Sequence, residues 1–184
     1  MRQALSLHPE SRCTAATRID VDAARRRRGG LVLRFVVTGK IADLRLPPVT
    51  SPARKDDLWR HTCFEAFVGA TAATVYYEFN FAPSTHWAAY GFEDYRSEMS
   101  VSGELNAPRI EVKSTAARYE LRASLELDRL PALPDDAPWR LGLSAAIEET
   151  NGGMSYWALA HPPGKADFHH ADCFAHELPA AWRP

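Results

Sequence analysis

Alternation of hydrophobic and polar residues with a period of two is the clearest pattern in this chain. It is most regular over residues 118–127, where the hydrophobic side holds Tyr119, Leu121, Ala123, Leu125 and Leu127. Residues 139–147 alternate in the same way, beginning at Trp139. Successive side chains of a β-strand point to opposite faces, so both segments are predicted to be strands with one face on a core and the other in water.

Further strands are predicted where β-branched and aromatic residues gather between turn signals. They cover residues 31–38, 63–68, 76–81, 85–92, 108–113, 155–160 and 174–178. Residues 15–21 are expected to pair with 31–38 across an arginine-rich turn, and the Asn151-Gly152-Gly153 turn predicts a hairpin into residues 155–160. Residues 1–20 otherwise carry little periodic signal.

Roughly eight or nine short strands without a long amphipathic helix indicate an all-β fold. The predicted architecture is a two-sheet antiparallel β-sandwich, immunoglobulin-like or jelly-roll-like, with a closed barrel as the alternative. A chain of 184 residues is long enough for one well-buried domain and short for two, so residues 1–184 are expected to form a single domain.

The charges and cysteines argue against several classes of function. A formal net charge of -1 provides no overall field that would attract nucleic acid or an anionic membrane, and the four arginines 25–28 are interpreted as a solvated loop. Three cysteines without C-x-x-C spacing argue against a disulfide framework and a cysteine-type zinc site. No secretory or membrane-spanning apolar run is present, which predicts a cytoplasmic protein. A small molecule is therefore the expected partner, and the oligomeric state stays open.

Polar and aromatic residues are predicted to share the outer surface of two neighbouring strands. If the hydrophobic sets of 63–68 and 76–81 face the core, this surface holds Glu65, Tyr76, Glu78 and Asn80, with Tyr90 beside them and Trp59 and His61 at its edge. Aromatic rings stack on the C–H face of a sugar while carboxylates and amides bind its hydroxyls. The pattern is typical of a polyol site, although the same residues would also suit a rim of core aromatics with solvated glutamates.

Two other kinds of chemistry are weaker interpretations of the same sequence. Glu65 and Glu78 are a carboxylate pair of the kind that performs acid and base catalysis on a glycosidic bond. Residues 161–176 combine histidines, Cys173 and aspartates that would suit a transition metal, but their spacing matches no established template, and a polar loop is the commoner explanation. Phosphate-binding loops and nucleophile elbows do not occur in the sequence.

Three stretches carry a resemblance to a known family. They are residues 57–67, which run from Asp57-Leu58-Trp59 to Glu65-Ala66-Phe67; residues 77–84, which end in Asn80-Phe81-Ala82-Pro83-Ser84, with 87–90; and residues 155–165 with 167–169. Across about residues 30–178 the chain resembles the bacterial DOMON-like proteins, which are similar to DOMON domains and family 9 carbohydrate-binding modules.

The resemblance implies a β-sandwich that holds a ligand: a sugar in the carbohydrate-binding modules, and haem or a sugar in DOMON domains. By this analogy Trp59 and Trp157 would stack on the ligand, and Glu65, Glu78 and Asn80 would make polar contacts.

The sequence thus favours a non-catalytic module that binds a small ligand, most of all a carbohydrate. The candidate ligand-binding residues are Trp59, His61, Glu65, Glu78, Asn80, Tyr90, Trp157 and His161. The alternatives are a glycoside hydrolase-like enzyme that uses Glu65 and Glu78, and a haem or metal protein that uses His61, His161 or His169. No cofactor is expected for a carbohydrate-binding module. Haem or a divalent metal would be bound only under the last alternative.

Overall fold

The computed structural model describes residues 2–99 and 105–181, and in this part of the chain it contains twelve strands and three single-turn 3-10 helices. The first strands are β1 (Arg2–Leu7), β2 (Ala16–Arg25), β3 (Gly30–Gly39), β4 (Cys63–Ala70), β5 (Tyr76–Phe81) and β6 (Trp87–Asp94). The others are β7 (Ser97–Met99), β8 (Arg109–Ser114), β9 (Arg118–Glu126), β10 (Trp139–Glu148), β11 (Met154–Ala158) and β12 (His176–Leu178). The 3-10 helices are η1 (Ile41–Asp43), η2 (Leu58–Arg60) and η3 (Ala171–Cys173).

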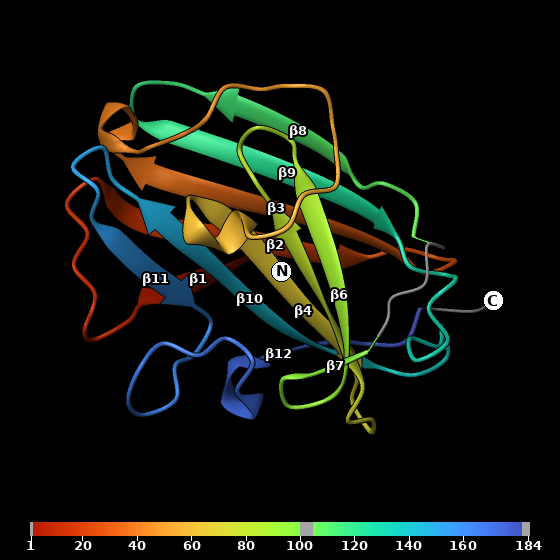
Figure 1. Ribbon diagram of the computed structural model, residues 1–184. Helices are drawn as coiled ribbons and strands as arrows, with labels where there is room; N and C mark the ends of the chain where they lie inside the picture. The colour runs from red at the N-terminus through yellow and green to blue at the C-terminus, as the bar shows by residue number, and fades with distance from the viewer. Residues whose placement is uncertain (1, 100–104, 182–184) are drawn as a thin grey trace.

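The strands form two antiparallel sheets that lie face to face (Figure 1). The first sheet has the order β1-β2-β3-β9-β8, and the second has the order β7-β6-β5-β4-β10-β11, with β12 beside β10. β1 joins them, because its residues 2–5 pair with β2 whereas Ser6 and Leu7 pair with β11. The strand order ends at two edge strands, β7 and β8, so the sheets do not close into a barrel. The predicted all-β sandwich is confirmed.

The N-terminal strand is the main feature of the fold that the alternation pattern did not predict. Only Leu5 of β1 is fully buried, with Leu7 packed partly against the core, so the strand has no long run of alternating hydrophobic residues. Its place depends on backbone pairing at both edges. The predicted pairing of 15–21 with 31–38 is confirmed, because β2 and β3 are hydrogen-bonded along their length.

The core lies between the inner faces of the two sheets, and large aromatic side chains fill its centre. The ring centroid of Phe64, on β4, lies 5.2 Å from that of Phe35 and 6.0 Å from that of Tyr119, which come from the first sheet. β4 and β5 are buried along their entire length on both faces, unlike β9, whose charged residues face outward. Other parts of the chain therefore cover the outer face of the second sheet as well, and the candidate site lies between them and this face.

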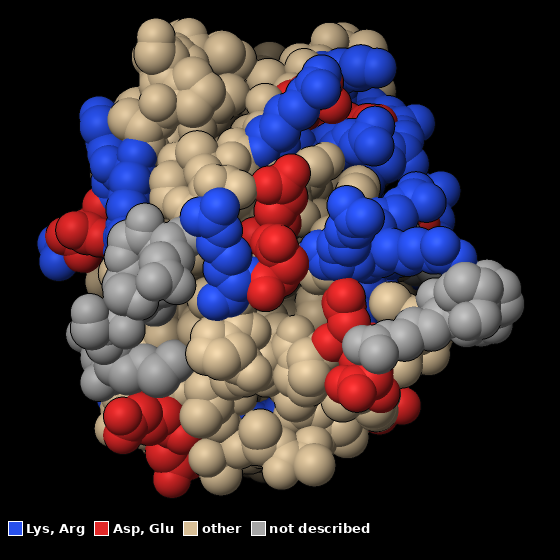
Figure 2. Space-filling view, turned by 90° about the vertical axis from the view of Figure 1, so that its right-hand side faces the viewer, with Lys and Arg blue, Asp and Glu red and all other residues tan. Residues whose placement is uncertain are grey.

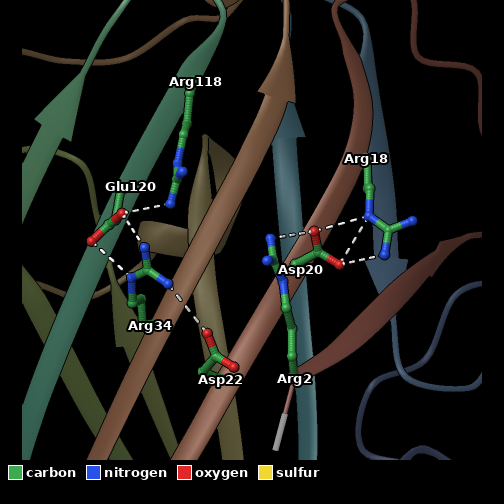
Figure 3. Close-up of polar contacts among 7 residues, drawn as sticks. All are labelled: Arg2, Arg18, Asp20, Asp22, Arg34, Arg118 and Glu120. Carbon is green, nitrogen blue, oxygen red and sulfur yellow. Dashed lines mark hydrogen bonds and ion pairs between the residues drawn. The ribbon is translucent and has the colours of Figure 1, made fainter.

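Ion pairs occupy the outer face of the first sheet. Arg34 bonds Glu120 at 2.7 Å and Asp22 at 3.3 Å, and neighbouring strands add Asp20 between Arg2 and Arg18, each 2.8 Å away (Figure 3). In the view of Figure 2, Lys and Arg are most numerous at the upper right, and a column of Asp and Glu lies beside them near the centre. The charges on the outer face of the first sheet are thus largely satisfied by one another.

The arginine-rich turn is only partly solvated. Arg25, at the end of β2, is an exception to the predicted solvated loop, because its guanidinium lies 3.6 Å from the centroid of the Trp139 ring. It donates to the backbone oxygens of Ala137 at 2.7 Å and Pro134 at 2.8 Å, and only 4% of its side chain is exposed. Arg26 is exposed, so the two neighbours provide a matched comparison.

Among the described residues, no helix has the length and apolar character needed to cross a membrane.

We expect Arg25→Ala to lower the free energy of unfolding by about 2–4 kcal/mol, because it removes the buried guanidinium together with its cation–π contact and its hydrogen bonds to the carbonyls of Ala137 and Pro134. Arg26→Ala should change it by no more than about 0.5 kcal/mol. Urea denaturation of the two variants measures the difference. Equal effects would contradict a structural role for Arg25.

Candidate functional site

A cavity of about 600 Å³ lies on the outer face of the second sheet. Aromatic side chains from the strands and from two loops form much of its wall: Trp59, Phe67, Tyr90, Phe92, Tyr156 and Phe168. Its polar groups are mainly acidic: Asp56, Asp57, Glu65, Glu78, Arg96 and His169. The cavity therefore combines flat hydrophobic surfaces with hydrogen-bonding groups, as small-ligand sites commonly do.

Strand register brings the central groups of this cavity together. Phe67 on β4 lies opposite Glu78 on β5, and Glu78 lies opposite Tyr90 on β6. Glu65 is two residues before Phe67, so it shares the same face and is a diagonal neighbour of Glu78. The alternation of β4 and β5 is sufficient to place both carboxyl groups on the outer face.

Residues 159–175, which we call the covering loop, pack over the lower part of this face. Its His169 ring lies 5.0 Å from Phe67 and 4.9 Å from Phe92, and Phe174 lies 5.4 Å from Tyr76, as measured between ring centroids. The loop can approach β10 closely because Gly142 has no side chain; a Cβ there would lie 3.2 Å from the backbone oxygen of Cys173. The loop converts an exposed sheet face into the wall of a cavity.

Glu65 is 3% exposed, and among the described residues its one hydrogen bond is a long contact of 3.5 Å from Ser144 Oγ to its Oε2. Burial raises the pKa of Glu65 well above its ordinary value, and the negative charge of Glu78 raises it further. Asn80 Nδ2 donates to Glu78 Oε1 at 2.7 Å. The two carboxyl groups thus differ in environment, and Glu65 retains its proton to a higher pH than an exposed glutamate.

A chain of polar contacts connects Glu78 to the covering loop. His169 Nε2 lies 3.5 Å from Glu78 Oε2, and its Nδ1 lies 2.9 Å from Tyr76 Oη. Burial, with the nearby charge of Arg96, lowers the pKa of His169 to about 4, so the ring is neutral at pH 7. A neutral ring that accepts from Tyr76 at Nδ1 presents its Nε2–H to Glu78.

Two polar contacts fix groups at the rim. Arg96 donates to Asp167 at 2.8 Å, and this ion pair ties the segment after β6 to the covering loop. Tyr90 Oη donates to Asp56 Oδ1 at 2.9 Å, and burial together with this bond raises the pKa of Tyr90. The Tyr90 hydroxyl therefore stays protonated and available as a hydrogen-bonding group.

Four of the eight sequence-predicted residues line the cavity: Trp59, Glu65, Glu78 and Tyr90. Trp59, on η2, is 50% exposed at the rim. Asn80 lies behind the wall, fully buried, where its Oδ1 accepts from Cys63 and its amide donates to Glu78. From this position Asn80 orients the Glu78 carboxyl group and does not line the cavity itself.

The other three predicted residues lie away from the cavity wall. Trp157 is a core residue, 5% exposed, because its neighbour Tyr156 points outward and strand alternation turns Trp157 inward against Ala145. His61 Nδ1 contacts Glu148 Oε2 at 2.8 Å, and His161 Nε2 contacts the backbone oxygen of Ser6 at 2.8 Å.

The residues considered for a metal are dispersed. His169 faces Tyr76 and Glu78, His170 accepts from the backbone N–H of Asp172, and Cys173 donates to the carbonyls of Ala160 and Asp167. Within residues 2–99 and 105–181, no group of three or more His, Cys, Asp or Glu side chains could hold a metal ion.

Sequence reasoning missed the residues that loops bring to the cavity. Phe168, His169 and Arg96 reach it only because of the path of the chain after β6 and β11, for which the sequence has no periodic signal. His169 was considered only as a haem or metal ligand, and not as part of the carbohydrate site. Tyr156 could have been found, because it is out of phase with Trp157 in the same strand.

Solved structures with the same fold include carbohydrate-binding proteins. A carbohydrate-binding protein of Bacteroides uniformis ATCC 8492, so named provisionally, aligns with a TM-score of 0.67 at 12% identity, over 94% of this chain and 83% of that one. A family 9 carbohydrate-binding module of Caldicellulosiruptor kristjanssonii aligns with TM-scores of 0.50 in its glucose complex and 0.51 in its cellotriose complex, at 9% and 10% identity. These alignments cover 87% of this chain and 76% and 74% of the module's chain. At these identities the likeness shows a shared fold.

No protein-family model matches the chain, and no curated protein matches it significantly.

Glu65→Gln tests the buried carboxyl group through the pH dependence of stability. Between the ordinary glutamate pKa of about 4.3 and the raised pKa of Glu65, the folded state binds more protons than the unfolded state, so the free energy of unfolding falls as pH rises. Glu65→Gln has no carboxyl group at this position, so its free energy of unfolding does not fall for this reason as pH rises. Its stability relative to wild type should increase from about pH 4.5 towards about pH 7, by at most ~1.4 kcal/mol per pH unit.

Urea denaturation across this range measures the difference, with Glu111→Gln, at an exposed position on β8, as the control. Parallel curves for wild type and Glu65→Gln would contradict the raised pKa.

Proposed function

We propose that the protein is a non-catalytic module that binds a carbohydrate in the cavity on the outer face of the second sheet. One observation carries the proposal: six aromatic side chains and several carboxyl groups converge on a cavity of about 600 Å³. Rings provide stacking surface for the C–H face of a sugar, and acidic or hydroxyl groups at fixed positions bind its hydroxyls. The fold shared with family 9 modules supports this proposal.

Within this proposal each part of the cavity has a role. Trp59 at the exposed rim is the first stacking surface that a ligand meets, and Tyr156 replaces Trp157 as the aromatic contribution of β11. Glu65 in its protonated form donates a hydrogen bond, whereas Glu78 accepts one. Because these groups lie on paired strands, their spacing is fixed before a ligand binds, which limits the entropy lost on binding.

The finer assignment to the bacterial DOMON-like proteins is part of the same proposal. It is supported by the aromatic and acidic residues of 57–67 and 77–84, which form β4, β5 and the approach to them. Sugar binding of this kind requires no cofactor, and we propose that the module acts without one.

A glycoside hydrolase is the second candidate, because the pKa of Glu65 is raised as a catalytic acid requires and Glu78 lies beside it.

Trp59→Ala should weaken binding of glucose or cellotriose by about tenfold or more, which corresponds to ~1.4 kcal/mol of lost stacking. The fold should be unaffected, because Trp59 is half exposed. Val49→Ala, at a position that is 60% exposed and outside the cavity, is the matched control. Isothermal titration calorimetry measures the affinities, and equal affinity of both variants for every sugar bound by wild type would refute this site.

The hydrolase candidate is tested by release of reducing sugar from a panel of glycosides. We expect no turnover by the wild-type protein. Turnover that is lost in both Glu65→Gln and Glu78→Gln, and retained in Glu111→Gln, would establish the enzyme instead.

A further inference from the structure

Acidic side chains outnumber basic ones in the cavity, which is an unusual balance for a site that binds a neutral sugar. Four carboxyl groups line it, against one arginine. That arginine, Arg96, is held by Asp167 at 2.8 Å, so its charge is already paired. Asp57 pairs with Arg60 at 3.3 Å, but among residues 2–99 and 105–181 neither Glu65 nor Asp56 forms an ion pair.

Glu65 is the strongest sign that a group from outside completes the site. Its side chain lines the cavity although it is 3% exposed, and within residues 2–99 and 105–181 its one hydrogen bond is the 3.5 Å contact from Ser144. A buried carboxyl group is normally hydrogen-bonded or paired with a cation. Here the open side faces the cavity, where a ligand donor would lie against both Glu65 and the neighbouring Glu78.

The aromatic walls favour the same kind of ligand. Cations are attracted to the faces of Trp and Tyr rings, and sites for ammonium groups commonly combine such rings with carboxylates. Trp59, Tyr90 and Tyr156 line the cavity together with Asp56, whose Oδ1 accepts from Tyr90 Oη at 2.9 Å. Rings and acids are thus interleaved around one space.

We propose that the ligand carries a positive charge, and that its class is an amino sugar with a free ammonium group. This inference rests on the proposed carbohydrate function and specifies its ligand. The ammonium lies between Glu65 and Glu78 and donates to both, and its positive charge favours the ionised form of Glu65, which is protonated when no cation lies beside it. The sugar ring stacks on the aromatic wall. Asp56 at the rim adds a second favourable charge for an oligosaccharide with several amino groups.

Two trisaccharides that differ only at C2 provide the test. Cellotriose has a hydroxyl group at C2 of each sugar, and the fully deacetylated chitosan trimer has an amino group there on the same β-1,4 backbone. Calorimetry with the full chain at pH 6.5, where most of the amines are protonated, and in salt near physiological strength should give at least about tenfold tighter binding of the amino trimer.

Variants distinguish the cavity from general attraction of a cation. The ratio of the two affinities should fall several-fold in Glu65→Gln and in Asp56→Asn, and should be unchanged in Glu111→Gln on the other sheet. Asp56 is exposed, so its variant keeps the test valid if Glu65→Gln folds poorly. Thermal melting of each variant reports whether it is folded.

The outcomes separate this inference from the proposed function. Equal affinity for the two trimers, or a ratio that is unchanged in both cavity variants, would overturn the cationic ligand and leave carbohydrate binding intact. Binding of neither trimer would overturn both proposals.

Discussion

Burial of β4 and β5 on both faces is the constraint on which the site depends. Their inner side chains, such as Phe64 and Phe79, belong to the core between the sheets. Their outer side chains are covered by the loop of residues 159–175 and by neighbouring rings. Because carboxyl groups occupy outer positions of these strands, the fold places Glu65 and Glu78 in an environment where charge is expensive. For Glu65, the long hydrogen bond from Ser144 offsets only part of this cost.

The two outer faces of the sandwich differ in how their carboxyl groups are stabilised. On the first sheet, Asp20 and Glu120 have arginine partners on the same or adjacent strands, which hold the pKa of each carboxyl below its ordinary value (Figure 3). On the second sheet Glu65 has no such partner among the described residues, and its pKa moves in the opposite direction. A face whose charges satisfy one another is complete by itself, whereas we propose that a ligand completes the second face.

The parts of the fold that could be predicted from sequence are those with two-residue periodicity. Alternation located β9 and β10, and it put Glu65, Glu78 and Tyr90 on one surface. It did not locate β1, because that strand buries only Leu5 and is held by pairing with both sheets.

The candidate site shows the same division between strands and loops. Phe168 and His169 reach the cavity through an irregular loop whose path depends on tertiary packing, including the close approach at Gly142. Trp157 was selected for its residue type and its resemblance to stacking tryptophans, although its phase in β11 turns it into the core. Strand phase was a better guide than residue type to which side chains line the cavity.

The most direct test of the account is to map ligand binding onto the backbone by NMR. Titration of the ¹⁵N-labelled protein with cellotriose and with its deacetylated amino counterpart would report which amides respond. We predict saturable shifts at Glu65, Phe67, Glu78 and Tyr90, and at His169 of the covering loop, with the ion-paired face of the first sheet unaffected. Shifts confined to β2, β3 and β9, or no saturable shift with either sugar, would contradict the assignment of the cavity as a carbohydrate site.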